Sequence, residues 1–308
     1  MKKFNWKIKT LTGALGLGFA LVSGQAAAAN DSYEDNSIDS VGTINANGVW
    51  VPDANSTINT GDILLAAVEF GTHNGVAYPA GTGLTGIAAV QVATIIPTGT
   101  TNTIVFNPVS VGIDAILNAF GVSQTVTGGG AGGGAMVALW YQASGSILNL
   151  DQSLLPSPGL SCATLTACIG QATLGTQYEV MGFNGDLDNI WAAFNAATNT
   201  AVVLASDPSF AFGTYNAALS VLYNNTGLNI IADAKNCSPI CGAGDGKSDV
   251  LISGGINGGA GLAAGLTGQG VVATDDAQYS QTIPEPASLA LLGIGLIGLG
   301  AMRRKSSV

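Results

Sequence analysis

The sequence predicts a mainly β, sandwich-like domain with one or two short helices packed on its sheet. Three observations support this prediction. Short apolar runs with strand character recur along the chain, clusters of Gly, Asn, Asp and Pro separate these runs, and only two segments show helical spacing. The 308 residues include 44 glycines, and 9% are charged, against roughly 25% in a typical soluble domain. A coiled coil or a charged disordered chain is therefore excluded.

Six runs are predicted strands, and the first two are apolar on both faces, which is typical of strands inside a sheet. They cover residues 62–70, 86–96, 103–106, 135–142, 178–183 and 216–223. In the last run, alternation places Ala217, Leu219, Val221 and Tyr223 on one face. We expect that face to lie in the core.

Two segments with apolar residues at i, i+3, i+4 and i+7 predict short amphipathic helices on the sheet. The first covers residues 113–120, with Ser110 as its N-cap and Gly121 as its end. The second covers residues 187–194 and follows a cap at Asp186. In the second helix, Trp191 and Phe194 are expected to be core residues rather than a platform for sugars.

Residues 30–60 are polar and hold four clustered acids, so they are predicted to be a flexible, solvated segment. The acids are Asp31, Glu34, Asp35 and Asp39. The predicted organisation is a signal peptide at 1–29, this segment at 30–60, a mainly β domain with Gly-rich loops at 61–283, and a C-terminal tail at 284–308.

The charges are distributed unevenly. Residues 30–286 hold all 19 acidic residues and only two lysines, Lys235 and Lys247, a net charge of −17. Such a surface repels DNA, RNA and anionic lipid, which excludes a nucleic-acid partner. With His73 as the single histidine and no recognisable catalytic set, the sequence predicts a protein that is not an enzyme and needs no cofactor.

The N-terminus has the parts of a secretory signal peptide. Residues 1–9 are basic, residues 11–22 are mostly apolar, and the alanines at 26–29 offer a cleavage site before Asn30. The apolar stretch is too short to cross a bilayer comfortably. We therefore expect export of the chain with removal of residues 1–29.

The C-terminus combines three features in a fixed order. The triplet Pro284, Glu285 and Pro286 precedes an apolar run at 287–302, and the basic residues Arg303, Arg304 and Lys305 close the chain. As a helix the run extends roughly 24 Å, which reaches across a ~30 Å hydrocarbon core only with snorkelling or local thinning. The basic end would stay in the cytoplasm. The sequence therefore predicts a transient inner-membrane anchor through a C-terminal transmembrane helix.

This order of triplet, apolar run and basic end resembles the PEP-CTERM sorting tail. The resemblance implies an exosortase substrate from a Gram-negative bacterium that produces an extracellular polysaccharide. It also implies removal of the tail near Pro284–Pro286 and a destination at the cell surface or in a biofilm matrix. It covers about 26 residues and the signal peptide, and it assigns nothing to the body between them.

The four cysteines form two local pairs, Cys162 with Cys168 and Cys237 with Cys241. An even number of cysteines in an exported chain favours disulfides. Local pairing is preferred over cross-links because both loops carry turn residues and need no long-range docking. A four-thiolate zinc site is the alternative, but the spacings depart from the usual two-residue knuckle, so no metal is predicted.

Two loops hold paired carboxylates, Asp186 with Asp188 and Asp245 with Asp249. Loops of this composition can bind Ca²⁺, and carboxylates facing across a cleft can hydrolyse glycosides. Helix caps and turns are the competing interpretation. The glycines at 128–133 fit G-x-G-x-x-G, but the run that follows is strand-like, which argues against a dinucleotide site.

Three roles follow for the mature body. The leading hypothesis is a structural or interaction component of the cell surface or the polysaccharide matrix. The second is a polysaccharide-binding module, which requires exposed stacking residues in one groove; the candidates are Trp50, Trp140, Tyr141 and Tyr215. The third is a matrix hydrolase built on paired carboxylates.

Overall fold

The computed structural model describes residues 28–53, 58–99, 101–143, 148, 162–196, 211–241, 243–258 and 271–284. The chain divides into two compact units. One contains residues 31–282, and the other contains the chain ends, 1–30 and 283–308. The fold below is that of residues 31–282, with strand bounds given in full.

Strands dominate the described residues. They are β1 (Ala28–Ile44), β2 (Trp50–Pro52), β3 (Ile63–His73), β4 (Val76–Ala77), β5 (Gly83–Thr98), β6 (Thr101–Pro108), β7 (Ala135–Gln142), β8 (Thr176–Gly182), β9 (Ile190–Ala196), β10 (Ala211–Asn224), β11 (Lys235–Asn236), β12 (Lys247–Ser248), β13 (Val250–Gly258) and β14 (Val271–Pro284). Two short helices, α2 (Ile113–Ala119) and α3 (Leu165–Ala172), lie between strands. The prediction of a mainly β domain with one or two short helices is confirmed.

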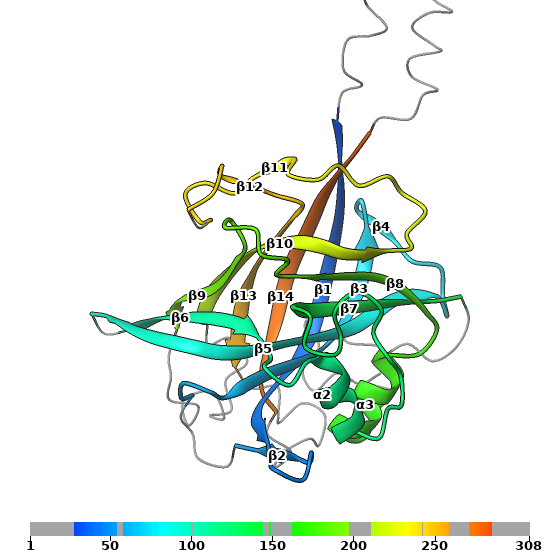
Figure 1. The fold of residues 1–308 in the computed structure, drawn as a ribbon. Coiled ribbons are helices and arrows are strands. Elements are labelled where there is room, and N and C mark those ends of the chain that lie inside the picture. Colours follow the sequence, from blue (N-terminus) through cyan, green and yellow to red (C-terminus); the bar gives the residue numbers. More distant parts are fainter. Residues whose placement is uncertain are drawn as a thin grey trace, which may run out of the picture. The chain divides into compact units, whose positions relative to one another are not determined.

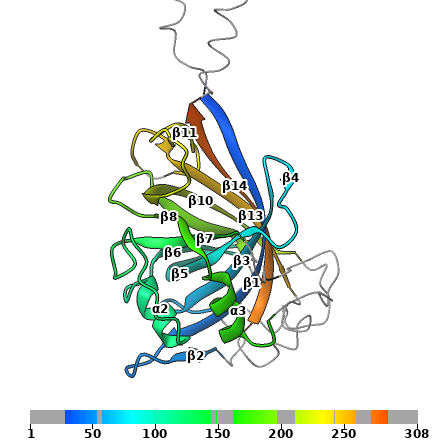
Figure 2. The ribbon, with the colours of Figure 1, turned by 90° about the vertical axis from the view of Figure 1, so that its right-hand side faces the viewer.

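Among these strands, twelve form one antiparallel sheet that returns to its own beginning. Its order runs β3, β1, β14, β13, β10, β8, β7 and β5, and β5 pairs again with β3 (Figures 1 and 2). The long strands β5 and β10 are joined twice, by β7 and β8 and by β6 and β9. Opposite parts of the sheet therefore face each other across a core, which is consistent with the sandwich-like layering that the sequence predicts.

Apolar side chains pack on both faces of this closed sheet. The inner core lies inside the closure and includes Phe70, Phe106, Met181 and Tyr279. The outer core lies between the outer face of β3, β5 and β7 and the two helices; it includes Leu65, Ile87, Ile116 and Ile169. This double burial explains why the strands at 62–70 and 86–96 are apolar on both faces.

The six predicted strands all form, but the sequence predicted the wrong face of the sheet for one residue, Tyr223. Ala217 and Leu219 of β10 lie in the inner core, and Val221 packs against it. Between Val221 and Tyr223 the pairing of β10 with β8 shifts register, which marks a bulge. Because an extra residue reverses the alternation, Tyr223 packs against the outer core instead.

The first predicted helix is confirmed as α2, with Ile113, Ile116 and Leu117 buried. Gly121 follows the helix with a φ of 75°, as expected for a glycine that ends a helix. The predicted cap at Ser110 is wrong, since Gly112 occupies the N-cap position and no side chain caps the helix.

The second predicted helix is wrong, because Trp191 and Phe194 belong to strand β9. Leu187, which the helical spacing placed on the buried face, is 70% exposed. Pairing with β6 and β10 on both sides outweighs the local helical spacing. Trp191 is nevertheless buried in the inner core, as expected of a core residue.

The second helix of the fold, α3, carries Cys168 and was not predicted. Its N-cap Thr164 accepts a hydrogen bond from the Ala167 N–H at 3.1 Å. Four of its eight residues are buried, among them Leu165 and Ile169. The signal in the sequence was the Thr cap before Leu165, hidden among small residues.

Residues 30–60 are not a flexible segment over the part that forms β1 and β2, so this prediction is wrong. β1 pairs with β3 from Tyr33 to Gly42, and it neighbours β14 on its other side. The four clustered acids do not mark a solvated segment, because one of them, Asp31, is buried in a polar network. A domain boundary at residue 61 therefore divides strands of one sheet.

The predicted signal peptide and tail lie almost entirely outside the described residues. Among the residues that the structure does describe, no helix has the length and apolar character needed to cross a membrane. The predicted transmembrane segment at 287–302 is not among them.

Gly86 of β5 fits a position where strands approach closely. A Cβ at this residue would overlap the Ala138 carbonyl oxygen and the Leu139 side chain of β7. Only a residue without a Cβ leaves the β5–β7 pairing undisturbed.

We predict that Gly86→Ala lowers the free energy of unfolding by about 1–3 kcal/mol, because backbone and core must shift to admit the methyl group. Urea denaturation measures the change. Gly71→Ala in β3 is the matched control, since a Cβ there meets nothing within 4 Å. Equal effects of both substitutions would contradict the close approach of β5 and β7.

Candidate functional site

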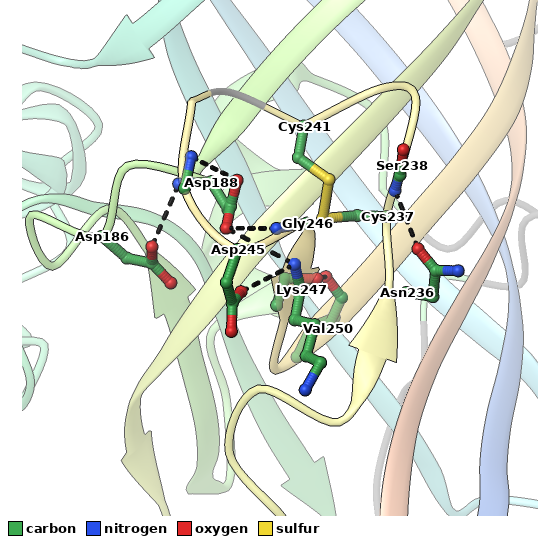
Figure 3. The surroundings of a disulfide bond; sticks show 12 residues. Asp186, Asp188, Asn236, Cys237, Ser238, Cys241, Asp245, Gly246, Lys247 and Val250 are labelled. Carbon is green, nitrogen blue, oxygen red and sulfur yellow. Dashed lines mark hydrogen bonds between the residues drawn. A yellow bond between two sulfur atoms is a disulfide. The ribbon is translucent and has the colours of Figure 1, made fainter.

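The two acidic loops that the sequence singled out meet in the structure. The Asp188 carboxylate, just before β9, accepts hydrogen bonds from the N–H groups of Gly244 and Gly246, both at 2.9 Å (Figure 3). Gly244 and Gly246 belong to the loop between β11 and β12. One carboxylate therefore joins segments that lie 56 to 58 residues apart.

These contacts decide the charge state of Asp188. Burial acts to raise the pKa of its carboxyl, but hydrogen bonds from Gly246, Gly244 and Lys247 outweigh burial, and the pKa is lowered. A carboxylate that accepts several backbone N–H groups is favoured in its charged form. Asp188 is therefore a structural anion that fixes the β11–β12 loop.

The other carboxylates of these loops also accept backbone hydrogen bonds. Asp186 accepts from the Asp188 N–H at 3.0 Å, and Asp245 accepts from the Lys247 N–H at 3.1 Å. Asp249 accepts from the N–H groups of Val221 and Asp233, both at 2.8 Å. Asp186 and Asp245 therefore stabilise local turns, whereas Asp188 and Asp249 hold segments that are distant in the sequence. Within the described ranges, no three His, Cys, Asp or Glu side chains gather as metal ligands.

Both disulfides have the predicted local pairing. Cys237 and Cys241 close the same β11–β12 loop, and Cys162 is bonded to Cys168 of α3. No cysteine is free. The zinc alternative is therefore wrong.

A polar hollow of about 700 Å³ lies beside the Cys237–Cys241 disulfide. Asn236, Ser238, Asp245 and Lys247 contribute its polar side chains. Between residues 30 and 286 the chain has only two lysines and no arginine, and Lys235 is buried. Lys247 is thus the one exposed lysine or arginine of that stretch, and it lies at this hollow.

The aromatic residues proposed to stack on sugars do not form an exposed platform. Trp50, Trp140 and Tyr215 are 8%, 2% and 5% exposed, and only Tyr141 is exposed, at 37%. Trp50 packs on Phe120 in the outer core, while Tyr215 stacks on Trp191 in the inner core. The sequence could not show whether these aromatic residues are buried in a core or exposed for stacking on sugars, because both faces of the sheet are covered.

A second polar cluster, which we call the Asp31 network, was missed by the sequence interpretation. The Asp31 carboxylate accepts hydrogen bonds from Tyr33 Oη at 2.9 Å and from Asn74 Nδ2 and Gln281 Nε2, both at 3.0 Å. It also contacts Nε2 of His73, the single histidine of the sequence. The network connects β1, the end of β3 and β14.

Burial acts to raise the pKa of Asp31, but hydrogen bonds from Gln281, His73, Tyr33 and Asn74 lower it overall. The Tyr33 ring stacks on His73 with 4.4 Å between centroids, and its hydroxyl lies 3.2 Å from that of Tyr178. Four side chains thus hold one buried anion. Tyr33, which follows Asp31 at strand spacing, was the signal that could have revealed a strand here.

Glu179 of β8 is a second buried carboxyl close to this network. Tyr279 Oη donates to Glu179 Oε2 at 2.7 Å, while Oε1 has no hydrogen-bond partner among the described residues. Burial raises the pKa of Glu179 to about 8; the Tyr279 hydrogen bond opposes this, and the charges of Asp31 and Asp249 add to it. Burial without a full set of hydrogen-bond partners costs a neutral carboxyl less solvation free energy than it costs a carboxylate.

The comparisons with known proteins concern the end of the chain. Residues 282–305 match the PEP-CTERM protein-sorting motif. The chain carries a PEP-CTERM sorting motif. No curated protein and no solved structure matches the chain.

The PEP-CTERM motif implies an exported, cell-surface-directed protein that is processed by an exosortase. Its match begins at Thr282 on β14, and Pro284 is the last residue of that strand. Five predicted sorting residues lie outside the described residues; they are Glu285, Pro286, Arg303, Arg304 and Lys305. The matched motif therefore begins within β14, the last strand of the closed sheet.

We predict that Glu179→Gln changes how stability depends on pH. The unfolded chain loses the Glu179 proton near pH 4.5, whereas the folded protein keeps it to about pH 8. The unfolding free energy of the unmodified protein should therefore fall as pH rises through this window. The variant has no such proton, so its stability relative to the unmodified protein should rise by about 2–4 kcal/mol from pH 5 to pH 8.

Urea denaturation at pH 5 and pH 8 measures both proteins. Glu34→Gln is the control, because this carboxyl is exposed and accepts only the Thr72 hydroxyl in the described structure. If Glu179→Gln leaves the pH dependence unchanged, Glu179 ionises alike in both states and is not held neutral.

Proposed function

We propose that the mature body is a non-enzymatic component of the cell surface or of an extracellular polysaccharide matrix. An exosortase would release it from a transient inner-membrane anchor in a polysaccharide-producing Gram-negative bacterium. The single observation that carries this proposal is the PEP-CTERM motif joined directly to the last strand of a disulfide-bonded body.

The body itself supports a structural rather than a catalytic role. Its candidate acids at the β11–β12 loop accept backbone N–H groups and thereby hold loops together. The one histidine pairs with Asp31 inside a network that joins three strands. A charge of −17 over residues 30–286 keeps such a body soluble outside the cell.

We predict that Glu285→Ala with Pro286→Ala blocks removal of the tail, because the exosortase is expected to recognise the triplet. The measurement is intact mass of the protein from the native host, in membrane and extracellular fractions. The unmodified protein should end near Pro286 and gain about 4 Da on thiol reduction, two hydrogens for each disulfide. The variant should stay in the membrane with residues 287–308.

Ser288→Ala, two residues after the triplet, is the matched control and should be processed normally. An unmodified protein that keeps residues 287–308 outside the cell would refute the sorting step.

Deleting the gene should alter cell aggregation or matrix texture without a metabolic defect. An unchanged biofilm would refute the matrix role and leave the sorting step standing.

The polar hollow favours a second role, the binding of matrix polysaccharide. Sugar hydroxyls both donate and accept hydrogen bonds, and the hollow offers Lys247 as a donor and Asp245 as an acceptor. Asp188 and the Cys237–Cys241 disulfide hold its backbone in place, which lowers the entropy cost of binding. Because the body is acidic, a neutral polysaccharide fits it better than an anionic one.

We predict that Lys247→Gln weakens binding of the processed protein to the neutral polysaccharide of its host about tenfold, the cost of one hydrogen bond from a charged donor. Co-sedimentation of protein with purified polysaccharide measures this. Glu34→Gln lies outside the hollow and should bind normally. Equal binding of both variants would exclude the hollow as a polysaccharide site.

A further inference from the structure

The closed sheet leaves a cavity of about 80 Å³ in its inner core. Its walls come from strands all around the closure, and five aromatic rings line it: Phe70, Phe106, Trp191, Tyr215 and Tyr279. Two pairs of these rings are in contact, Trp191 stacked on Tyr215 at 6.0 Å and Phe70 against Tyr279 at 6.1 Å. A closed sheet of about eight strands is wide enough to hold one small ligand.

One carboxylate, that of Asp39, lies among these apolar walls. Asp39 stands opposite Ala66 in the β1–β3 pairing, and Ala66 also lines the cavity. Its Oδ1 accepts a hydrogen bond from the buried Ser37 hydroxyl at 2.9 Å. The side chain is partly exposed, so solvent reaches this side of the cavity.

We propose that this cavity binds a small organic cation, an alkylammonium ion with about four non-hydrogen atoms. Aromatic faces attract cations, and aromatic-lined sites recognise alkylated ammonium groups. The Asp39 carboxylate supplies the opposite charge that a cation needs in an apolar site. The net charge of −17 over residues 30–286 also attracts a cation over a longer range.

The volume sets the size of the ligand. A dry cavity of about 150 Å³ holds benzene, which has six non-hydrogen atoms. A cavity of about 80 Å³ therefore accepts roughly three or four such atoms. A neutral molecule of this size would gain at most a hydrogen bond from Asp39 and no ion–ion attraction, and an anion would be repelled by it.

The test uses the full chain with both disulfides formed, kept soluble in a non-ionic detergent. The probe is trimethylammonium chloride, and isopropanol is a neutral probe with the same number of non-hydrogen atoms. Sodium chloride at equal ionic strength controls for salt. Calorimetric titration and tryptophan fluorescence report binding, and a bound probe also raises the melting temperature.

Trimethylammonium should bind at least tenfold more tightly than isopropanol. Asp39→Asn should remove this preference while leaving isopropanol binding unchanged, because the shape of the side chain is kept. Ala66→Val should abolish binding of both probes by filling the cavity. Glu34→Gln removes a negative charge away from the cavity and should bind trimethylammonium as the unmodified protein does.

Circular dichroism establishes that each variant folds. If Asp39→Asn does not fold, the affinities of the unmodified protein for the two probes still test whether the cavity prefers a cation. Equal affinity for trimethylammonium and isopropanol, or no binding of trimethylammonium, would overturn the proposal. These results leave the surface role untouched, since that role rests on the sorting motif.

Discussion

The pairing that closes the sheet is the constraint on which the rest of this structure depends. β1 lies between β3 and β14, so the first and last strands of the described fold are neighbours. Without this contact the sheet would have two open edges, and the inner core would lose its continuous wall. The Asp31 network reinforces the closure, because Gln281 of β14 donates directly to a carboxylate on β1. A buried anion is stable there only because several donors surround it.

Closure also explains the burial pattern. Helices α2 and α3 cover the outside of β3, β5 and β7, while β6 and β9 add a second connection between β5 and β10 (Figure 1). Strands covered on both faces need few polar residues, which accounts for much of the low charge of the chain. Two acids outside the strands, Asp188 and Asp249, hold the β11–β12 region in place.

Local patterns in the sequence were sufficient where local interactions decide. The strand at 135–142, helix α2 and both disulfides follow from neighbouring residues, and all were predicted. The errors arose where distant residues decide. β9 has helical spacing but is held as a strand by two partner strands. Asp31 was predicted to be solvated, because its hydrogen-bond donor Gln281 lies 250 residues away in the sequence. The aromatic candidates failed for the same reason, because exposure depends on which faces are covered.

The adjacency of β1 and β14 imposes an order on events in time. A chain is made N-terminus first, so β1 emerges early and keeps one edge unpaired until residues 271–284 follow. That segment is continuous with the sorting motif, which starts at Thr282. The strand that closes the sheet and the start of the sorting motif are therefore synthesised together. Any chain that stops short of β14 would expose an edge strand, and aggregation with other chains is the expected fate of such an edge.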